Sequence, residues 1–193
     1  SYAGRTLVPV NQPLPVRTGG FGGAHGLARY LHDEGITHVV DATHPFADTM
    51  SRNAMEACVA AGVPLIALVR PQWTQGPHDH WITVPDLAGA ASALPDESTC
   101  VFLAIGRQHL QEFAAKPQHR YILRFVDEPD GQLPLPQSEV IVARGPFTEE
   151  GDLDLMRSRH VAWVVTRNSG GSGARAKIDA ARCMEIPVIM ISR

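Results

Sequence analysis

The sequence is poor in cysteine, in lysine and in long apolar runs. Its three cysteines, Cys58, Cys100 and Cys183, lie far apart, which favours reduced thiols over a disulfide or metal pair and agrees with a cytoplasmic location. No apolar stretch approaches the roughly 20 residues that span a membrane, and the first residues do not have the pattern of a signal peptide. With a formal net charge of −3 and no basic tail, the sequence gives no indication of a nucleic-acid partner.

Several catalytic patterns are absent as well. No tyrosine is followed by lysine four residues later, as in short-chain dehydrogenases, and there is no Gly-x-Ser-x-Gly nucleophile elbow. His78-Asp79-His80 could bind a metal, but a solvated loop is the preferred interpretation, because the other histidines form no ligand cluster. Nucleophilic and metal chemistry are therefore disfavoured, and no metal site is expected.

What the chain does have is an alternation of short apolar runs with helical patterns. Strands are expected over 39–42, 64–69, 81–84, 100–105, 121–126, 140–143, 161–165 and 187–191, and helices over 47–61, 86–94, 108–115, 148–159 and 173–184. This alternation predicts an α/β fold with parallel sheets and helices on both faces. The run 64–69 is expected to be buried on both faces, and Ser172 is expected to cap the helix over 173–184.

Residues 70–80 are polar and rich in proline and glycine, which indicates a domain boundary. The sequence predicts two Rossmann-like doubly wound domains, over residues 1–75 and 76–193. Residues 1–6 (Ser-Tyr-Ala-Gly-Arg-Thr) have the pattern of a loop that follows a strand, and the first half has few strands for a complete doubly wound sheet. The first domain is therefore expected to lack its N-terminal strand–helix unit.

Arginines recur directly after the expected strands. They are Arg70, Arg107, Arg144 and Arg167. Ligands of open parallel sheets bind outside the carboxyl ends of the strands, and arginine holds a carboxylate or phosphate with a two-pronged fork. Each arginine could instead pair with a local acid such as Asp41 or Asp127. We expect at least two of the four to bind an anionic ligand.

Glycine-rich segments give a second indication of an anion site. Thr166-Arg167-Asn168-Ser169-Gly170-Gly171-Ser172-Gly173 stands between a strand and a helix, where glycines allow close backbone approach and helix N–H groups can bind an anion. Gly106-Arg107-Gln108 repeats the arrangement more weakly. Gly20, Gly22 and Gly26 have a G-x-G-x-x-x-G spacing before a helix that ends near Gly35. A glycine-rich turn without a ligand is the alternative in each case.

The run Asp41-Ala42-Thr43-His44-Pro45-Phe46-Ala47 places two polar side chains at the end of a strand. Thr43 and His44 would lie in the ligand crevice of a parallel sheet. His44 could act as an acid or donate a hydrogen bond to a carboxylate. Alternatively, His44 only shapes the turn before Pro45.

These segments together resemble the precorrin-6A reductases (CobK/CbiJ-like) of cobalamin (vitamin B12) biosynthesis. The likeness rests on the run over residues 41–47, on the turn Arg70-Pro71-Gln72-Trp73, and on residues 166–171 with Lys177 following. It extends over essentially the whole chain. The resemblance implies two Rossmann-like domains with ligands in the cleft between them, and reduction of precorrin-6A to precorrin-6B by a hydride from NADPH. The substrate is a tetrapyrrole with many carboxylates, which suits the arginines.

On this resemblance, Thr43, His44, Pro45, Phe46 and Arg70 are expected to bind substrate, with His44 as the candidate catalytic acid. The expected cofactor-binding residues are Gly106, Arg107, Gln108, Thr166, Arg167, Asn168, Ser169, Gly170, Gly171 and Lys177. Handover to neighbouring enzymes of the cobalamin pathway is a further expectation. Two alternatives stay open: reduction of the cobalt-containing substrate of the anaerobic pathway with NADH, and a non-catalytic module that binds a nucleotide or a tetrapyrrole.

Overall fold

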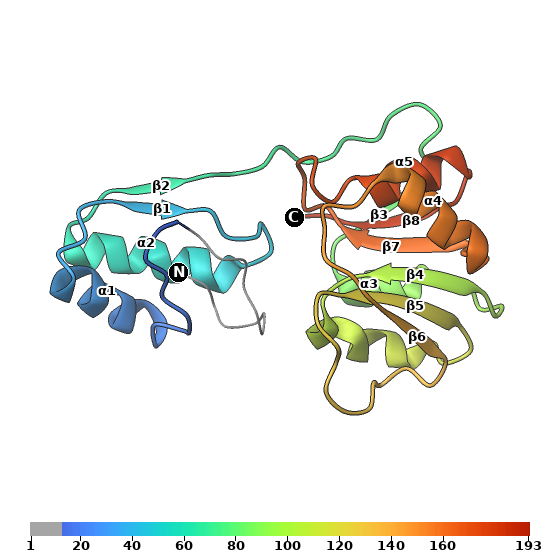
Figure 1. Ribbon diagram of the computed structural model, residues 1–193, viewed down its shortest axis with the longest axis horizontal. Helices are drawn as coiled ribbons and strands as arrows, with labels where there is room; N and C mark the ends of the chain where they lie inside the picture. The colour runs from blue at the N-terminus through green and yellow to red at the C-terminus, as the bar shows by residue number, and fades with distance from the viewer. Residues whose placement is uncertain (1–12) are drawn as a thin grey trace. The chain divides into compact units, whose positions relative to one another are not determined.

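The computed structural model describes residues 13–193, which divide between two compact units (Figure 1). One unit ends at Arg70, and the other comprises Pro71–Arg193. The loop expected over residues 1–6 lies outside the described residues. No helix within residues 13–193 is long and apolar enough to cross a membrane.

The first unit combines two helices with a two-stranded parallel sheet. Helices α1 (Gly23–Asp33) and α2 (Asp48–Ala61) accompany strands β1 (Val39–Asp41) and β2 (Leu65–Ala67). The core is made of small and aliphatic side chains from both helices: Leu27, Leu31, Ala54, Ala57 and Cys58. Gly62 ends α2 as predicted, at φ 67°, because glycine adopts this left-handed conformation without a steric penalty.

The strand predicted over 64–69 is shorter and more exposed than expected. Ile66 is 61% exposed and Val69 is 69% exposed, whereas Leu65 packs on the helical core. The prediction of burial on both faces is therefore wrong for the part of the chain that the structure describes. The cause is that β2 pairs with β1 in a small sheet whose apolar contacts with the helices involve one face.

The second unit is a doubly wound sheet of six parallel strands. Its elements are β3 (Trp81–Val84), α3 (Leu87–Ser92), β4 (Cys100–Ala104), the 3₁₀ helix η1 (Arg107–Ala115), β5 (Arg120–Phe125), β6 (Ser138–Val142), α4 (Glu149–Ser158), β7 (Trp163–Arg167), α5 (Ala176–Cys183) and β8 (Val188–Ile191). The strand order is β3-β8-β7-β4-β5-β6, and each neighbouring pair is parallel. The predicted α/β fold with parallel sheets is confirmed.

The direction of the crossovers divides the helices between the two faces. The chain moves one way along the sheet through α3 and η1 and the opposite way through α4 and α5. Right-handed crossovers in opposite directions place their helices on opposite faces. In agreement, α4 packs on α5, and α3 packs on η1. A doubly wound sheet of this kind has one point where the direction reverses, and that point lies between β4 and β7.

Three local expectations need correction. Residues 107–115 form a 3₁₀ helix rather than an α-helix; the buried Leu110 and Phe113 are three residues apart, which matches the repeat of a 3₁₀ helix. Strand β7 begins at Trp163, two residues later than expected, and continues to Arg167. Ser172 does not cap α5 with its side chain, because α5 begins later than expected, after Arg175, and the Ser172 carbonyl accepts the Arg175 N–H at 3.2 Å.

Trp73 lies in the core of the second unit. Its side chain is 5% exposed and joins a cluster that includes Phe102, Val164 and Ile178. The expected domain limits, 1–75 and 76–193, would place Trp73 in the first domain. Its burial with strands and helices of the second unit assigns Trp73 to that unit instead.

Candidate functional site

The carboxyl ends of β4 and β7 form the switch point of the six-stranded sheet. After β4 the chain crosses to β5, whereas after β7 it crosses to β8 on the other side. Ala104 and Thr166 are partners in register at this edge, so the segments that follow them leave neighbouring strands. Open α/β sheets bind their ligands in the crevice at such a point. The fold therefore brings together the two segments that were predicted to bind the cofactor, residues 106–108 and 166–171.

The strand order also separates the arginines of the second unit. Arg107 comes after β4 and Arg167 is the last residue of β7, and these two strands are neighbours about 5 Å apart. Arg144 follows β6, two strands away from β4, and its guanidinium is 3.3 Å from the Asp127 carboxylate. Arg107 lies 3.9 Å from Asp130, in a pair so exposed that it contributes little to stability. Local acids thus contact two of the arginines, and Arg107 with Arg167 is the pair closest to the switch point.

The predicted substrate residues lie in the first unit. Thr43, His44, Pro45 and Phe46 follow β1, and Arg70 follows β2. Because β1 and β2 are parallel neighbours, their carboxyl ends lie at one edge of the small sheet. All five predicted substrate residues therefore belong to segments that leave the small sheet at this same edge.

Asp41 fixes the turn that carries Thr43. Its carboxylate accepts hydrogen bonds from the Ser51 hydroxyl at 2.6 Å and from the Thr43 N–H at 3.0 Å. Burial alone would raise the pKa of Asp41, but the hydrogen bonds from Ser51 and Thr43 outweigh it and lower the pKa. Asp41 therefore remains charged and is used within the turn, which ties β1 to α2.

His44 is exposed, and its ring takes part in the turn. Nδ1 accepts the Phe46 N–H at 3.3 Å, and the centres of the His44 and Phe46 rings lie 5.9 Å apart. An acceptor at Nδ1 implies that the neutral ring carries its proton on Nε2. His44 shapes the turn before Pro45, and in this tautomer its Nε2–H is a hydrogen-bond donor suited to a carboxylate.

The glycine-rich loop after β7 is held by Trp73. Asn168 uses both the oxygen and the nitrogen of its side-chain amide, accepting the Trp73 N–H at 2.8 Å and donating to the Trp73 carbonyl at 2.9 Å. The Trp73 indole donates to the Gly171 carbonyl at 2.6 Å, and the Gly171 N–H donates to the Pro71 carbonyl at 3.2 Å. The Asn168 side chain therefore shapes the loop, and a role of this residue in cofactor binding stays a prediction.

Two further residues constrain this loop. Gly170 has φ 67°, and a Cβ atom at this position would lie 2.2 Å from the Pro71 carbonyl oxygen. Arg193 donates to the Asn168 and Ser169 carbonyls, each at 2.8 Å. Sequence reasoning missed Arg193, although it follows β8 just as the other arginines follow their strands. The same pattern could therefore have found it.

The loop keeps backbone donors at the start of α5. Within residues 13–193, the N–H groups of Ser172, Gly173 and Ala174 have no hydrogen-bond acceptor. They precede the N-terminus of α5, where the helix dipole favours a negative charge. These donors, with Arg107 and Arg167 at the same switch point, suit the phosphates of a dinucleotide.

Lys177, predicted to bind the cofactor, points into the core. Its side chain is 5% exposed, and its ammonium donates to the Ala174 carbonyl and lies 5.2 Å from the centre of the Trp73 ring. Burial, with a smaller contribution from Arg124, lowers the pKa of Lys177 to about 8, against the opposing effect of Asp152. The contacts of Lys177 are thus with the loop and with Trp73.

A buried ion pair lies close to Lys177 and was not predicted. Arg124 of β5 and Asp152 of α4 form two hydrogen bonds, of which Nη2 to Oδ2 measures 3.3 Å. Their side chains are 10% and 2% exposed, and the Arg124 guanidinium stacks 3.6 Å from the Phe147 ring centre. The sequence signal that could have indicated this pair is Arg124 itself, a charged residue within an apolar strand.

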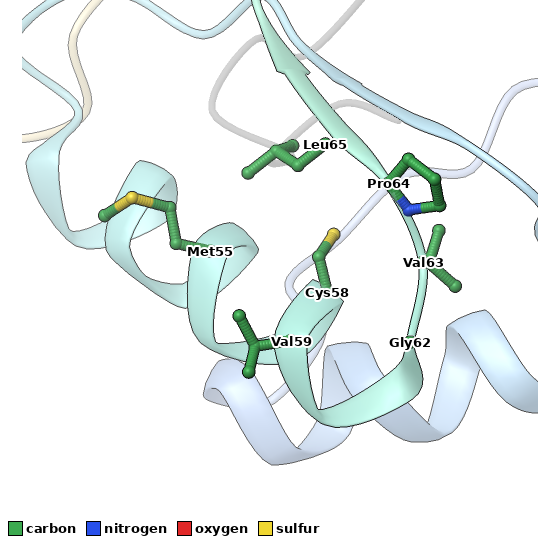
Figure 2. A pocket seen from close by; sticks show the side chains of 7 residues that line it. All are labelled: Met55, Cys58, Val59, Gly62, Val63, Pro64 and Leu65. Carbon is green, nitrogen blue, oxygen red and sulfur yellow. The ribbon is translucent and has the colours of Figure 1, made fainter.

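An apolar groove in the first unit is a separate feature (Figure 2). Met55, Cys58 and Val59 of α2 line it together with residues 62–65, which lead into β2. Burial raises the pKa of the Cys58 thiol. Because no charged or hydroxyl side chain lines this groove, it does not suit an anionic ligand.

The fold and these contacts define an α/β protein with a candidate anion site at the switch point of a doubly wound sheet. Within residues 13–193 no group of three histidine, cysteine, aspartate or glutamate side chains is placed to hold a metal ion. The family model described as precorrin-6x reductase CbiJ/CobK matches residues 1–193, and the chain belongs to this family of reductases of cobalamin biosynthesis. The predicted resemblance is thereby confirmed.

Individual relatives of the chain support the same family. The chain is 57% identical to the precorrin-6A reductase of Rhodobacter capsulatus over 193 residues, which is 100% of this chain and 77% of the relative. It is 39% identical to the precorrin-6A reductase of Mycobacterium tuberculosis, over 100% of this chain and 78% of the relative. A solved structure described as CobK precorrin-6A reductase matches with a TM-score of 0.98 and 57% identity, over 100% of this chain and 76% of that chain.

Proposed function

We propose that this chain reduces one ring double bond of precorrin-6A, giving precorrin-6B, with a hydride from NADPH. The observation that carries the proposal is the meeting of residues 106–108 and 166–173 at the switch point, in a chain 57% identical to a precorrin-6A reductase. The donors of that loop suit an anionic dinucleotide. The exposed Thr43 and His44 and the strand-end Arg70 suit the carboxylates of the tetrapyrrole.

The contribution of the protein in this proposal is positioning. The nicotinamide cofactor supplies the hydride when bound. The N–H groups of residues 172–174 and the dipole of α5 hold a phosphate, and Arg107 and Arg167 add charge and fix its orientation. Arg70 and the turn over residues 43–46 hold carboxylates of the substrate. Correct placement of two reactants accounts for a large part of many enzymatic rate enhancements.

Arg167→Met is expected to raise the KM for NADPH by about 10- to 100-fold, since a charge-assisted hydrogen bond contributes on the order of 1.5–3 kcal/mol. The KM for precorrin-6A should change little. Steady-state kinetics with each substrate varied in turn provide the measurement. Arg157→Met, at an exposed position of α4, is the matched control and should behave as wild type. An unchanged KM for NADPH would remove Arg167 from the cofactor site.

His44→Ala is expected to lower kcat by on the order of 10²-fold if the ring protonates the macrocycle. The measurement is kcat at saturating NADPH and precorrin-6A, with His38→Ala as control, because His38 is an exposed histidine of the same unit. If kcat is unchanged and only the KM for precorrin-6A rises, His44 binds a carboxylate and the acid role is wrong.

The proposed reaction is tested by mixing the protein with precorrin-6A and NADPH and following the nicotinamide absorbance. Oxidation at the rate of a no-enzyme control would contradict the proposal. A non-catalytic module would bind the ligands without oxidation.

The cobalt-containing substrate with NADH is the second candidate. A relative named cobalt-precorrin-6A reductase, from Priestia megaterium, is 31% identical over 174 residues, 85% of this chain and 68% of the relative. The higher identity to the precorrin-6A reductases favours the metal-free substrate. Comparing kcat/KM for the two substrates, each with NADPH and with NADH, distinguishes the candidates.

A further inference from the structure

A buried lysine supports the glycine-rich loop from its core side. Lys177 lies in the first turn of α5, with its side chain 5% exposed. Its ammonium donates to the Ala174 carbonyl, so it holds the residue that ends the row of backbone donors over residues 172–174. The contact is charge-assisted, which makes it about twice as strong as a hydrogen bond between neutral groups.

The same ammonium acts on the other end of the loop through Trp73. It lies 5.2 Å from the centre of the Trp73 ring, within the range of a cation–π interaction. That indole donates to the Gly171 carbonyl, and the backbone of Trp73 pairs with the amide of Asn168. One charge therefore contributes to holding both ends of the loop.

The charged groups that act on Lys177 come from two other elements. Arg124 of β5 disfavours the ammonium, and Asp152 of α4 favours it. Arg124 and Asp152 bind each other, so the net charge of the cluster depends on the protonation of Lys177. Burial lowers the pKa of Lys177 to about 8. Its charge therefore changes within a pH range in which the protein can be studied.

We propose that Lys177 is a positioning residue whose ammonium keeps the loop in its cofactor-binding form. This inference rests on the proposed function and deepens it, since Lys177 acts through Ala174 and Trp73 rather than by touching the cofactor. Loss of the proton removes the cation–π contact and weakens the bond to Ala174. The row of donors then loosens, and cofactor binding weakens while hydride transfer from bound cofactor stays unchanged.

The test is the Kd for NADPH from about pH 7 to about pH 9.5, measured by titration of the wild type, Lys177→Arg and Lys177→Met. For the wild type, Kd should rise about 10-fold over this range, since the cation–π contact is lost and the bond to Ala174 is weakened. Lys177→Arg, which stays charged, should show no such rise, and Lys177→Met should bind weakly at every pH. Lys116→Met, which changes the other lysine of the chain, is the control and should follow the wild type. A wild-type Kd that is independent of pH would overturn the proposal.

A purely structural role predicts a different pH trend. Because folding lowers the pKa of Lys177 from 10.5 to about 8, the unfolded chain binds more protons between these values, and the contribution of Lys177 to stability rises with pH. As pH rises, the wild type should therefore gain stability and lose NADPH affinity, each measured relative to Lys177→Arg at the same pH. If affinity follows stability, the positioning role is wrong.

Hydrogen-exchange protection of Asn168 and Gly171, whose N–H groups donate to the Ile191 and Pro71 carbonyls, separates this inference from the proposed function. Protection factors, which correct for the pH dependence of chemical exchange, should fall with pH in the wild type but not in Lys177→Arg. That result without any NADPH oxidation supports the control of the loop by Lys177 and contradicts the reductase proposal. Normal oxidation with unchanged protection contradicts the control of the loop alone.

Discussion

Asp152→Ala is expected to lower the free energy of unfolding by about 3–5 kcal/mol, because it leaves a buried charge without its partner. The Asp152 side chain is 2% exposed, and the Arg124 side chain that it binds is 10% exposed. Removal of the carboxylate leaves Arg124 and Lys177 as two buried cations without an anion to offset them. Urea denaturation provides the measurement, and Asp154→Ala, at an exposed position of the same helix, is the matched control.

A double variant tests the reason for this loss. If repulsion between Arg124 and Lys177 contributes, Asp152→Ala combined with Lys177→Met should be less destabilised than the sum of the two single variants. A double-mutant cycle measures this coupling directly. A loss below about 1 kcal/mol for Asp152→Ala would mean that water reaches Arg124 and that the pair behaves as an exposed one.

Gly170→Ala is expected to cost about 2–5 kcal/mol, from the left-handed backbone and from a clash with main-chain atoms. The residue has φ 67°, and its new Cβ atom would lie 2.2 Å from the Pro71 carbonyl oxygen. That oxygen belongs to the backbone and also accepts the Gly171 N–H, so it cannot move without breaking the contact. NADPH binding should weaken as well, because the glycine-rich loop must move away from Pro71 to make room for the new methyl group.

Gly173→Ala is the matched control for this variant. It lies in the same loop, its φ is not left-handed, and nothing lies within 4 Å of the Cβ atom that it would acquire. Thermal unfolding of both variants provides the measurement of stability, and NADPH titration is applied to Gly170→Ala. If the two variants lose similar stability, the close approach to Pro71 is not what requires glycine at position 170.

Much of the second unit could be predicted because its signals are local. Buried parallel strands appear as continuous apolar runs, and their ends are marked by glycine or arginine, as at Gly106 and Arg167. The rule that ligands bind at the carboxyl ends of strands then indicated residues 106–108 and 166–171 as ligand-binding segments. Sheet order brought them together, although no local pattern contains that order.

What could not be predicted depends on contacts between distant residues. The run over 64–69 is as apolar as a buried strand, but exposure is decided by what packs on it, and Ile66 is 61% exposed. The bond between the Asn168 amide and Trp73, 95 residues away, has no local pattern that could have indicated it. The partner of Arg124 is on α4, and only the fold shows that Asp152 rather than a ligand neutralises it.

The pairing of Trp73 with Asn168 also has a consequence for the order of folding. It joins residues 95 apart, and β3 pairs with β8 through Trp81 and Val188, near the two ends of the unit. Contacts between such distant residues carry a large loop-closure entropy and form late. The glycine-rich loop should therefore acquire its native shape only when β8 joins the sheet, so that partly folded chains have no competent anion site and cannot capture the cofactor early.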